Sequence, residues 1–483
     1  MNKELLQLQP TPVWKNFSKL NAVPRPSKKE ERVIAFAMDF GASLGLETFK
    51  DEVGNVIIRK PASAGMTHKK MVTLQSHLDM VHQKNADTVF DFDTQGIEMF
   101  IDGDWVKAEG TTLGADNGMG VASIMALLES TDIEHPPLEA LFTIDEETGM
   151  TGAFGLKGGV LKGELLLNLD TEEDDEIDIG CAGGIDVTAT RTYTEKMAVH
   201  GDVGYRIEVS GLTGGHSGID IDKGLGNANK IMNRLLYAGM TLHMRIGALD
   251  GGSLRNAIPR ESWCLLNIDK KQEASFLAVI KAVSQEIKNE LALVEPNLKI
   301  HLTSVKPCKK VMGLGAQGKF IRGIYAALNG VYTMSATIPD LVETSNNIAR
   351  VQLTNGAITI GCLTRSSVET GKMDLANSLK SVFELAGFDV GFSGSYPGWN
   401  PNPNSNILKV AKGIYKNLFK EDARVVACHA GLECGILGQN YPDVDVSSFG
   451  PTIVAPHSPD ERVSISSVQK FWKFLLEILK HTP

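Results

Sequence analysis

Short apolar runs that stop abruptly on polar residues recur along the first part of the chain. Three of them are residues 70–75 (KMVTLQ), 140–144 (ALFTI) and 164–170 (ELLLNLD). Each run has the length and composition of one buried strand. The polar residues at their ends are His77 with Asp79, Glu146 with Glu147, and Asp170. Because parallel strands of an open α/β sheet end at one edge, the pattern predicts a single crevice that receives these side chains.

Other segments carry apolar residues at helical spacing. This spacing predicts helices over residues 28–40, after the glycine-rich segment 111–120, and over 468–479. Strands are predicted on both sides of a turn within 47–59, and a hairpin or loop within 84–110. Strands interspersed with helices favour an α/β fold with a mixed sheet and helices on both of its faces.

The middle of the chain follows a different pattern. Between residues 187 and 384, strands such as 205–210 alternate with helices near 227–237 and 272–293, but the strands do not end on acids. We interpret residues 187–384 as an inserted α+β lid domain. The catalytic domain is then built from residues 1–186 and 385–483. The acids at 172–176 and 178 have the pattern of a solvated run.

Length, charge and cysteine usage narrow the class of protein. With 483 residues the chain exceeds the size of one core, which favours two domains. A net charge of -10 without a basic, aromatic-rich cluster argues against nucleic-acid binding. No segment approaches the ~20 apolar residues of a membrane span, and the first residues lack a signal-peptide core. We therefore expect a cytoplasmic protein that binds no membrane, with its six cysteines reduced.

Acids gathered in one crevice predict bound metal. Carboxylates that crowd together repel one another unless cations neutralise them. Asp116 lies among glycines 114, 118 and 120, which allow close approach of the backbone to a ligand. A second histidine would complete a dinuclear site, and His457, between two prolines near the C-terminus, is the candidate.

Each of these signals also has an ordinary structural interpretation when it is taken alone. Glu146 and Glu147 could form a solvated acidic turn. His77 could be a core histidine bonded to Asp79, and Asp116 could cap the helix that follows it. The metal hypothesis depends on their sum.

Nine motifs give the chain a resemblance to a known family. They are SHLDM, TLGADNG, IDEETGMTGA, LLNLDTEE, GGHSG, NAIPRE, YPGWNP, HAGLECG and PHSPDERV. In this order they resemble the dinuclear-zinc metallopeptidases that include carboxypeptidase G and aminoacylase, and within them the aminoacyl-histidine dipeptidase branch. The motifs cover nearly the whole chain, so the match is far more specific than any single motif.

The resemblance implies roles for the residues of the crevice. His77 and Asp170 would bind one zinc ion, Glu147 and His457 the other, and Asp116 would bridge the two ions from a peptide bond that is cis to Asn117. Asp79 would orient His77. Glu146 would be the general base for a hydroxide held between the metals.

The resemblance also implies residues that recognise substrate. His216, in a glycine-rich loop of the lid, would stabilise the oxyanion from its own chain or from a partner subunit, although a histidine in such a loop is often merely exposed. Asn256 would contact the substrate. Arg365 would bind its carboxylate, unless it is a surface arginine. Glu433 would pair with its amino group, unless it caps a glycine turn.

The function implied is metal-dependent hydrolysis of unblocked dipeptides, including Xaa-His dipeptides such as β-Ala-His, by a homodimeric enzyme that uses small peptides as substrates. An N-acyl amino-acid amidohydrolase with the same dinuclear site is the alternative. A dinuclear phosphohydrolase should use more histidines, and a non-catalytic relative should have lost ligands or the base. Cobalt or manganese could replace zinc, since mixed carboxylate and imidazole ligands discriminate weakly among these ions.

Overall fold

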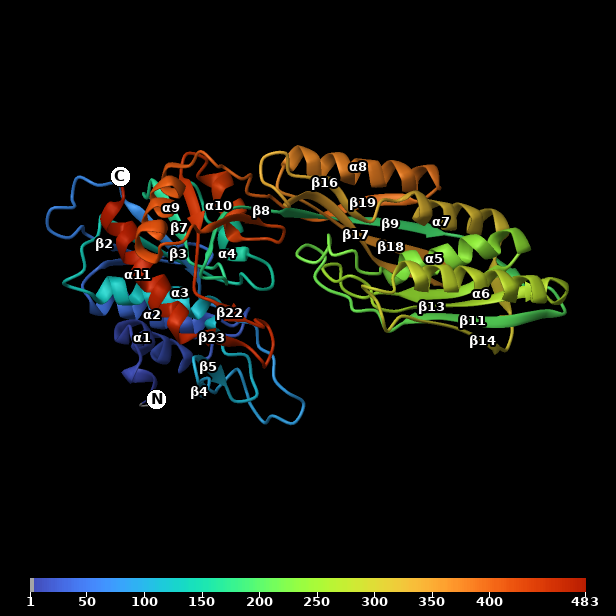
Figure 1. The fold of residues 1–483 in the computed structure, drawn as a ribbon, viewed down its shortest axis with the longest axis horizontal. Helices are drawn as coiled ribbons and strands as arrows, with labels where there is room; N and C mark the ends of the chain where they lie inside the picture. The colour runs from blue at the N-terminus through green and yellow to red at the C-terminus, as the bar shows by residue number, and fades with distance from the viewer. Residues whose placement is uncertain (1–3) are drawn as a thin grey trace. The chain divides into compact units, whose positions relative to one another are not determined.

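The chain forms two compact units in a computed structural model that describes residues 4–483 (Figure 1). Unit 1 contains the described residues up to Gly180, together with Trp399–Ala427 and Leu432–Pro483. Unit 2 contains Cys181–Gly398 and Cys428–Gly431. Unit 1 is thus built from both ends of the chain, and unit 2 is an insertion between them.

Unit 1 contains an eight-stranded mixed sheet. Its strand order is β1 (Glu47–Lys50), β2 (Val56–Lys60), β6 (Leu138–Thr143), β3 (Val72–His77), β7 (Leu165–Asn168), β21 (Asp445–Ser448), β8 (Glu176–Cys181) and β20 (Arg424–Cys428). The four neighbours β6, β3, β7 and β21 run parallel. Their carboxyl ends therefore meet at one edge, where the sequence predicted the crevice.

Helices cover both faces of this sheet. They are α1 (Thr11–Asn21), α2 (Glu31–Ser43), α3 (Ala115–Glu129), α4 (Thr151–Gly155), α9 (Asn406–Phe419), α10 (Glu433–Asn440) and α11 (Ile465–His481), after the short 3-10 helix η1 (Leu5–Gln7). Neighbouring strand residues point to opposite faces. Accordingly, Ile57 of β2 packs in the cluster that includes Ala153 of α4 and Leu437 of α10, whereas Ile58 faces Gly41 of α2. The predicted α/β class is confirmed.

A small second sheet in unit 1 joins distant parts of the chain. It contains β22 (Ile453–Val454), β23 (Arg462–Ser464), β5 (Trp105–Ala108) and β4 (Met99–Asp102), in that order. β4 and β5 form the hairpin predicted within residues 84–110. Pairing of β23 with β5 fixes the segment that carries His457 beside the first third of the chain.

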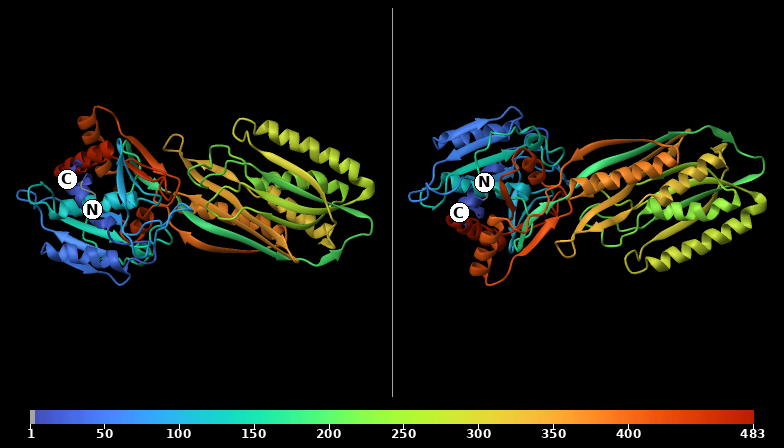
Figure 2. Two further views of the ribbon diagram at one scale, coloured as in Figure 1. Left: turned by 90° about the horizontal axis from the view of Figure 1, so that it is seen from below. Right: turned by 90° about the horizontal axis from the view of Figure 1, so that it is seen from above.

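Unit 2 is built on a nine-stranded antiparallel sheet. The order is β14 (Lys299–Val305), β11 (Asp202–Ser210), β13 (Ser262–Asp269), β12 (Arg245–Gly251), β17 (Val342–Thr354), β18 (Ala357–Ser366), β9 (Gly183–Thr192) and β19 (Asp389–Tyr396), and β16 (Gly330–Met334) also pairs with β17. A separate ribbon pairs β10 (Glu195–Met197) with β15 (Lys310–Met312). The helices are α5 (Ala228–Gly239), α6 (Glu273–Glu290), α7 (Leu314–Ala326) and α8 (Glu369–Leu385), with the 3-10 turns η2 (Met240–Leu242) and η3 (Lys270–Gln272). Figure 2 shows these four helices over one face of the sheet.

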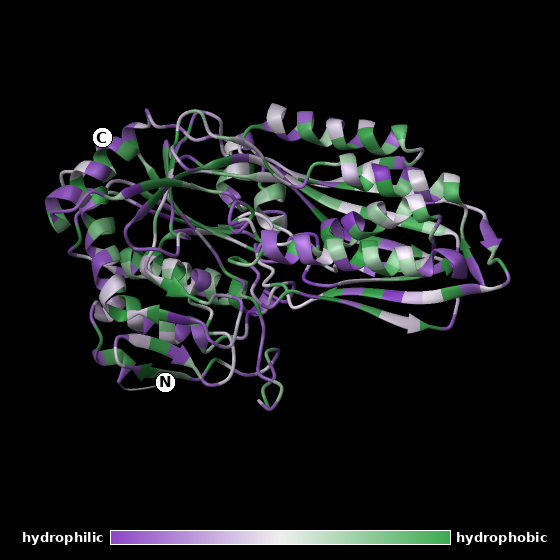
Figure 3. Cartoon of the chain, turned by 45° about the vertical axis from the view of Figure 1, so that its right-hand side comes forward, coloured by the Kyte–Doolittle hydropathy of each residue, from purple (hydrophilic) through white to green (hydrophobic). Residues whose placement is uncertain are grey.

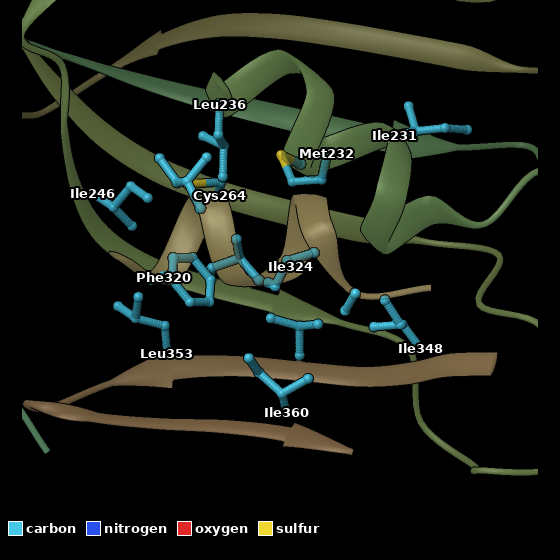
Figure 4. Close-up of a cluster of buried hydrophobic side chains, with 14 of the residues drawn as sticks. Ile231, Met232, Leu236, Ile246, Cys264, Phe320, Ile324, Ile348, Leu353 and Ile360 are labelled. Carbon is cyan, nitrogen blue, oxygen red and sulfur yellow. The ribbon is translucent and has the colours of Figure 1, made fainter. Parts of the chain in front are cut away.

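The core of unit 2 lies between the sheet and its helices. Figure 4 shows Met232 and Leu236 of α5 and Phe320 of α7 directed towards strand residues such as Leu353 and Ile360. Figure 3 shows hydrophobic and hydrophilic residues mixed along the same helices, as expected for helices with one buried face. The predicted domain boundaries, 186/187 and 384/385, fall inside β9 and α8. Both elements belong to unit 2, so its limits lie outside them.

One expectation about exposure is wrong for Asp178. The acids at 172–176 and 178 were predicted to be solvated, and Glu173 is exposed, but Asp178 lies in β8 and is only 4% exposed. The Asp178 carboxylate accepts a hydrogen bond of 2.8 Å from the Thr171 hydroxyl, which explains how the acid is buried.

Within residues 4–483, no helix has both the length and the apolarity that crossing a bilayer requires. All six cysteines lie within the described residues; none of them is in a disulfide bond, and each is at least partly buried.

Candidate metal centre

His77 ends strand β3 and is buried at the carboxyl edge of the sheet. Its Nε2 atom lies 3.2 Å from Asp116 Oδ1 and 3.5 Å from Asp170 Oδ1. On the other side of the ring, Nδ1 lies 3.1 Å from the backbone oxygen of Asp79. The ring therefore presents one nitrogen to two carboxylates while the other nitrogen is held by the backbone, as is usual for a histidine that binds metal.

Asp116 lies in the first turn of α3 and faces two histidines. Its Oδ1 atom lies 3.2 Å from His77 Nε2, and its Oδ2 atom lies 3.1 Å from His457 Nε2. The Asp116–Asn117 peptide bond is cis, as the resemblance implied. Asn117 in turn donates its side-chain amide to Asp170. One carboxylate thus has the geometry to bridge two cations.

His457 and Glu147 complete a second group around Asp116. His457 Nε2 lies 3.0 Å from Glu147 Oε2. The His457 side chain is 53% exposed, whereas that of Glu147 is 4% exposed. The other Glu147 oxygen, Oε1, is buried without a hydrogen-bond partner. A buried carboxylate oxygen that lacks a donor is suited to bind a cation.

Two groups with the ligand types of a metal site therefore share Asp116. In His77, Asp116 and Asp170, and again in Asp116, Glu147 and His457, the possible ligand atoms lie within 4.8 Å of one another. His77, Glu146 and Glu147 form a third such group. Glu146 therefore lies close to His77 of the first group and to Glu147 of the second. Imidazole and carboxylate donors in this number fit zinc, cobalt or manganese.

The fourth group consists of three acids, Glu30, Asp79 and Asp145. It differs from the other three because protein groups already donate hydrogen bonds to the Asp79 carboxylate. The Asp79 carboxylate accepts hydrogen bonds from Glu146 N at 3.0 Å, Glu147 N at 3.3 Å and the Ser27 hydroxyl at 2.8 Å. It also lies 3.5 Å from His77 Nδ1. Asp79 therefore holds the loop that carries both glutamates, in addition to lying beside the histidine that it was predicted to orient.

The electrostatics of the cluster reflect crowded acids. Burial raises the pKa of Glu147 to about 7 and raises that of Glu146 well above its usual value. For His457, burial lowers the pKa, but the hydrogen bonds with Asp116 and Glu147 outweigh this effect and hold it at about 11. The acids thus compete for protons and hold the histidine charged. A bound cation would relieve the same repulsion.

Three residues predicted to contact substrate come together in unit 2. Arg365 Nη2 lies 3.3 Å from His216 Nε2, and the Ser217 backbone donates a 2.8 Å hydrogen bond to the Asn256 carbonyl. Arg365 is 3% exposed, so it is not the surface arginine of the alternative interpretation. Its Nη1 atom donates to the Tyr396 hydroxyl at 2.8 Å. Motifs far apart in sequence thus form one polar cluster within this unit.

Glu433 lies in unit 1 at the start of α10 and is completely buried. Its Oε2 atom accepts hydrogen bonds from Gln75 Nε2 at 2.7 Å and from the Thr143 hydroxyl at 2.6 Å. Burial raises the pKa of Glu433 to about 8. Its Oε1 atom is buried without a hydrogen-bond partner. The side chain is therefore tied to the ends of β3 and β6 and retains one free acceptor.

Two residues that sequence reasoning missed pack against the metal centre. The buried carboxylate of Glu461 accepts hydrogen bonds from the backbone around Asp116, and the buried guanidinium of Arg25 donates to the same segment and to the one after His77. Glu461 stands in the quoted motif PHSPDERV, and Arg25 stands between two prolines. In neither case does the sequence context show whether the charged side chain is buried or lies at the surface. Elsewhere, in unit 2, His429 is buried, and its Nε2 atom lies 2.8 Å from the Ser345 hydroxyl oxygen.

The chain matches a peptidase family. Residues 73–481 match the model of peptidase family M20/M25/M40, and the chain belongs to this family. Because the match covers most of the chain, the family resemblance inferred from the motifs is confirmed.

Individual relatives extend this result to full length. The chain is 44% identical over 481 residues, 99% of each protein, to the cytosol non-specific dipeptidase of Escherichia coli K12. It matches the crystal structure of the aminoacylhistidine dipeptidase from Vibrio alginolyticus with a TM-score of 0.91 and 42% identity over 99% of this chain and 98% of that one. The aminopeptidase PepT of Bacillus cereus has the same fold at 16% identity, with a TM-score of 0.57 and 98% of each chain covered.

Proposed function

We propose that this chain is a metal-dependent dipeptidase that hydrolyses the peptide bond of free dipeptides, with Xaa-His dipeptides such as β-Ala-His among its substrates. The observation that carries the proposal is the pair of histidine and carboxylate groups that share Asp116, with Glu146 beside them. The names of the two full-length relatives, a non-specific dipeptidase and an aminoacylhistidine dipeptidase, support the same substrate class.

The metal ligands of the proposal are the five residues of the two groups. His77 and Asp170 would hold one ion, Glu147 and His457 the other, and Asp116 both. The unpartnered Oε1 atom of Glu147 and the mixed donor set fit two zinc ions, with cobalt or manganese as substitutes. Bound metal would supply Lewis-acid activation of the attacking water and of the scissile carbonyl.

Glu146 would move the proton in this reaction. Its backbone is held by Asp79, so the side chain has a fixed origin beside His77 and Glu147. Burial raises its pKa well above the ordinary range, which suits a carboxylate that takes a proton from water and returns it to the leaving amine. Asp79 would act by positioning both His77 and the glutamate loop.

Recognition of the substrate would use residues from both units. His216 would donate to the oxyanion, Arg365 would bind the C-terminal carboxylate, and Asn256 would contact the peptide. Glu433 would attract the free amino group through its unpartnered oxygen. An amino-group partner and a carboxylate partner together would limit substrates to dipeptides. Unit 2 would thus serve as a lid.

The proposal also covers the setting of the enzyme. The Escherichia coli relative is named as a cytosolic protein, which supports a cytoplasmic location for this chain. We further propose a homodimer, in which His216 would serve its own active site or that of the partner subunit.

The test is hydrolysis of a substrate panel by chelator-stripped protein, with and without added zinc, cobalt or manganese. The panel contains β-Ala-His, Gly-Gly, Leu-Gly, a tripeptide and an N-acetyl amino acid, and released amino acids are measured. We expect metal to restore cleavage of the free dipeptides alone. Cleavage of only the N-acetyl compound would instead indicate an amidohydrolase, and no cleavage with any metal would contradict the proposal.

A further inference from the structure

Glu461 makes an unusual set of contacts with the backbone. Its Oε2 atom accepts hydrogen bonds from Leu113 N at 2.7 Å and Gly114 N at 3.0 Å, and its Oε1 atom accepts from Ala115 N at 2.7 Å and Asp116 N at 3.3 Å. The residue is 2% exposed. One buried carboxylate thus receives four consecutive N–H groups, among them the first donors of α3, which have no partner within the helix.

Glu461 lies close in the sequence to His457, a proposed metal ligand. It follows His457 by four residues, and a turn in which Glu461 N donates to the Ser458 carbonyl at 3.0 Å connects the two. The backbone segment that donates hydrogen bonds to Glu461 ends at Asp116. The Oδ2 atom of Asp116 lies 3.1 Å from His457 Nε2. Glu461 therefore joins two segments, more than three hundred residues apart, that each supply a ligand to the second metal group.

Arg25 also holds this backbone, through a carbonyl group. Its Nη2 atom donates to the Gly114 carbonyl at 2.6 Å, and its Nη1 atom donates to the carbonyls of Leu78 and Asp79, each at 3.1 Å. Gly114 has φ +70°, and a Cβ atom there would lie 2.5 Å from Arg25 Nη2. The Asp116 segment is thus connected to the segment after His77 through Arg25, and to the segment after His457 through Glu461.

We propose that Glu461 is a positioning residue of the metal centre. It sets the distance between Asp116 and His457, so that the group Asp116, Glu147 and His457 is formed before metal arrives. The inference rests on the proposed function only in taking this group as a metal site. His77 ends β3 and Asp170 lies just beyond β7, and these two strands pair directly with each other. Loss of Glu461 should therefore weaken the second metal site more than the first.

The test is metal binding by Glu461→Gln, which keeps the size of the side chain but removes its charge and one acceptor oxygen. Zinc affinity is measured by equilibrium dialysis, and cobalt is titrated while the visible spectrum is recorded. We expect the site that contains His457 to weaken by about 10- to 100-fold, the range typical of residues that support metal ligands, and the other site, which shares Asp116, to weaken less. The spectral change of the second cobalt equivalent should shift to correspondingly higher cobalt concentration.

Glu139→Gln is the matched control. Glu139 is also buried, and it accepts hydrogen bonds from the backbone of Lys162 at 2.9 Å and Gly163 at 3.3 Å. It lies near the start of β6, whereas the metal groups lie beyond the ends of the strands. This variant should lose stability but bind both ions as the wild type does.

Glu461→Asp is the second variant. This variant keeps the negative charge but shortens the side chain by one methylene group. We expect it to lose less metal affinity than Glu461→Gln at the site that contains His457. Wild-type binding of both ions by Glu461→Gln would overturn the proposal, as would an equal loss of metal in the Glu139 control. Failure of both Glu461 variants to fold would also overturn it, because Glu461 would then support the whole unit. A wild type that binds both ions but cleaves no dipeptide would contradict only the proposed function.

Discussion

The two neighbouring glutamates, Glu146 and Glu147, show how identical side chains can acquire different roles. Both lie beside His77, and burial raises the pKa of both. Glu147 is also tied to His457 at 3.0 Å. Under the proposed function, Glu147 would therefore remain with a metal ion, whereas Glu146 would transfer a proton.

Replacing Glu146 should separate catalysis from metal binding. In Glu146→Ala we expect kcat to fall by about 10²- to 10⁴-fold, the usual contribution of a general base, with metal content near that of the wild type. Steady-state kinetics and elemental analysis of the same sample measure the two quantities. Undiminished turnover would remove Glu146 as the base.

His457→Ala provides the comparison for that experiment. Its ring faces Asp116 and Glu147 directly, so its loss should lower bound metal itself. If metal content stayed unchanged, His457 would lose its proposed role as a ligand.

At the scale of elements, the close packing of helix α3 against the sheet determines the position of Asp116. Gly120 lies one turn into α3, where a Cβ atom would meet Ser76 Oγ at 2.4 Å and the Leu169 carbonyl at 2.7 Å. Ser76 precedes His77, and Leu169 precedes Asp170. The absence of a side chain at position 120 therefore lets the helix that carries Asp116 approach the ends of β3 and β7, where His77 and Asp170 lie.

Gly120→Ala should accordingly destabilise unit 1 and disturb its metal site. Overpacking of this kind costs about 1–3 kcal/mol, and one of the close contacts is with the backbone oxygen of Leu169, which cannot move freely. The control is Gly413→Ala in α9, where nothing lies within 4 Å and the better helix propensity of alanine should stabilise by about 0.5–1 kcal/mol. Chemical denaturation of both variants measures the difference. Equal stability would contradict the packing argument.

At the scale of the whole molecule, all five proposed metal ligands belong to unit 1, although they span residues 77 to 457. Unit 2 is inserted between the fourth ligand, Asp170, and the fifth, His457. Closure of unit 1 by its C-terminal segment therefore completes the centre, and metal should stabilise this unit in particular.

Hydrogen exchange can test this local effect. A ligand present at one hundred times its dissociation constant stabilises the state that binds it by about 2.7 kcal/mol, or roughly 100-fold in exchange by unfolding. We expect zinc to slow exchange in β3 and β7 of unit 1 by about this factor and to leave β11 and β13 of unit 2 nearly unchanged. Equal slowing in both units would show that they unfold together.

Much of the fold was predictable because hydrophobic periodicity is local. The strands that lead to His77, Glu146 and Asp170 end close to where apolar runs meet polar residues, and the polar segment 84–110, predicted as a hairpin or loop, contains the hairpin of β4 and β5. The ordered motifs identified the family. The same periodicity failed for Asp178, because burial of an acid depends on a partner, Thr171, and on covering strands that the local pattern does not reveal.

The sequence by itself determined the class of protein, the elements that carry the candidate ligands and the residue types available for metal and proton chemistry, since each of these follows from composition, spacing and motif. Only the tertiary structure decided that both Asp116 oxygens face histidines, that Arg365 is buried beside His216, and that Glu461 holds the Asp116 segment. The physical reason is that these contacts join residues from about 40 to almost 350 positions apart. Their distances are set by how strands and helices pack, which spacing along the chain does not encode.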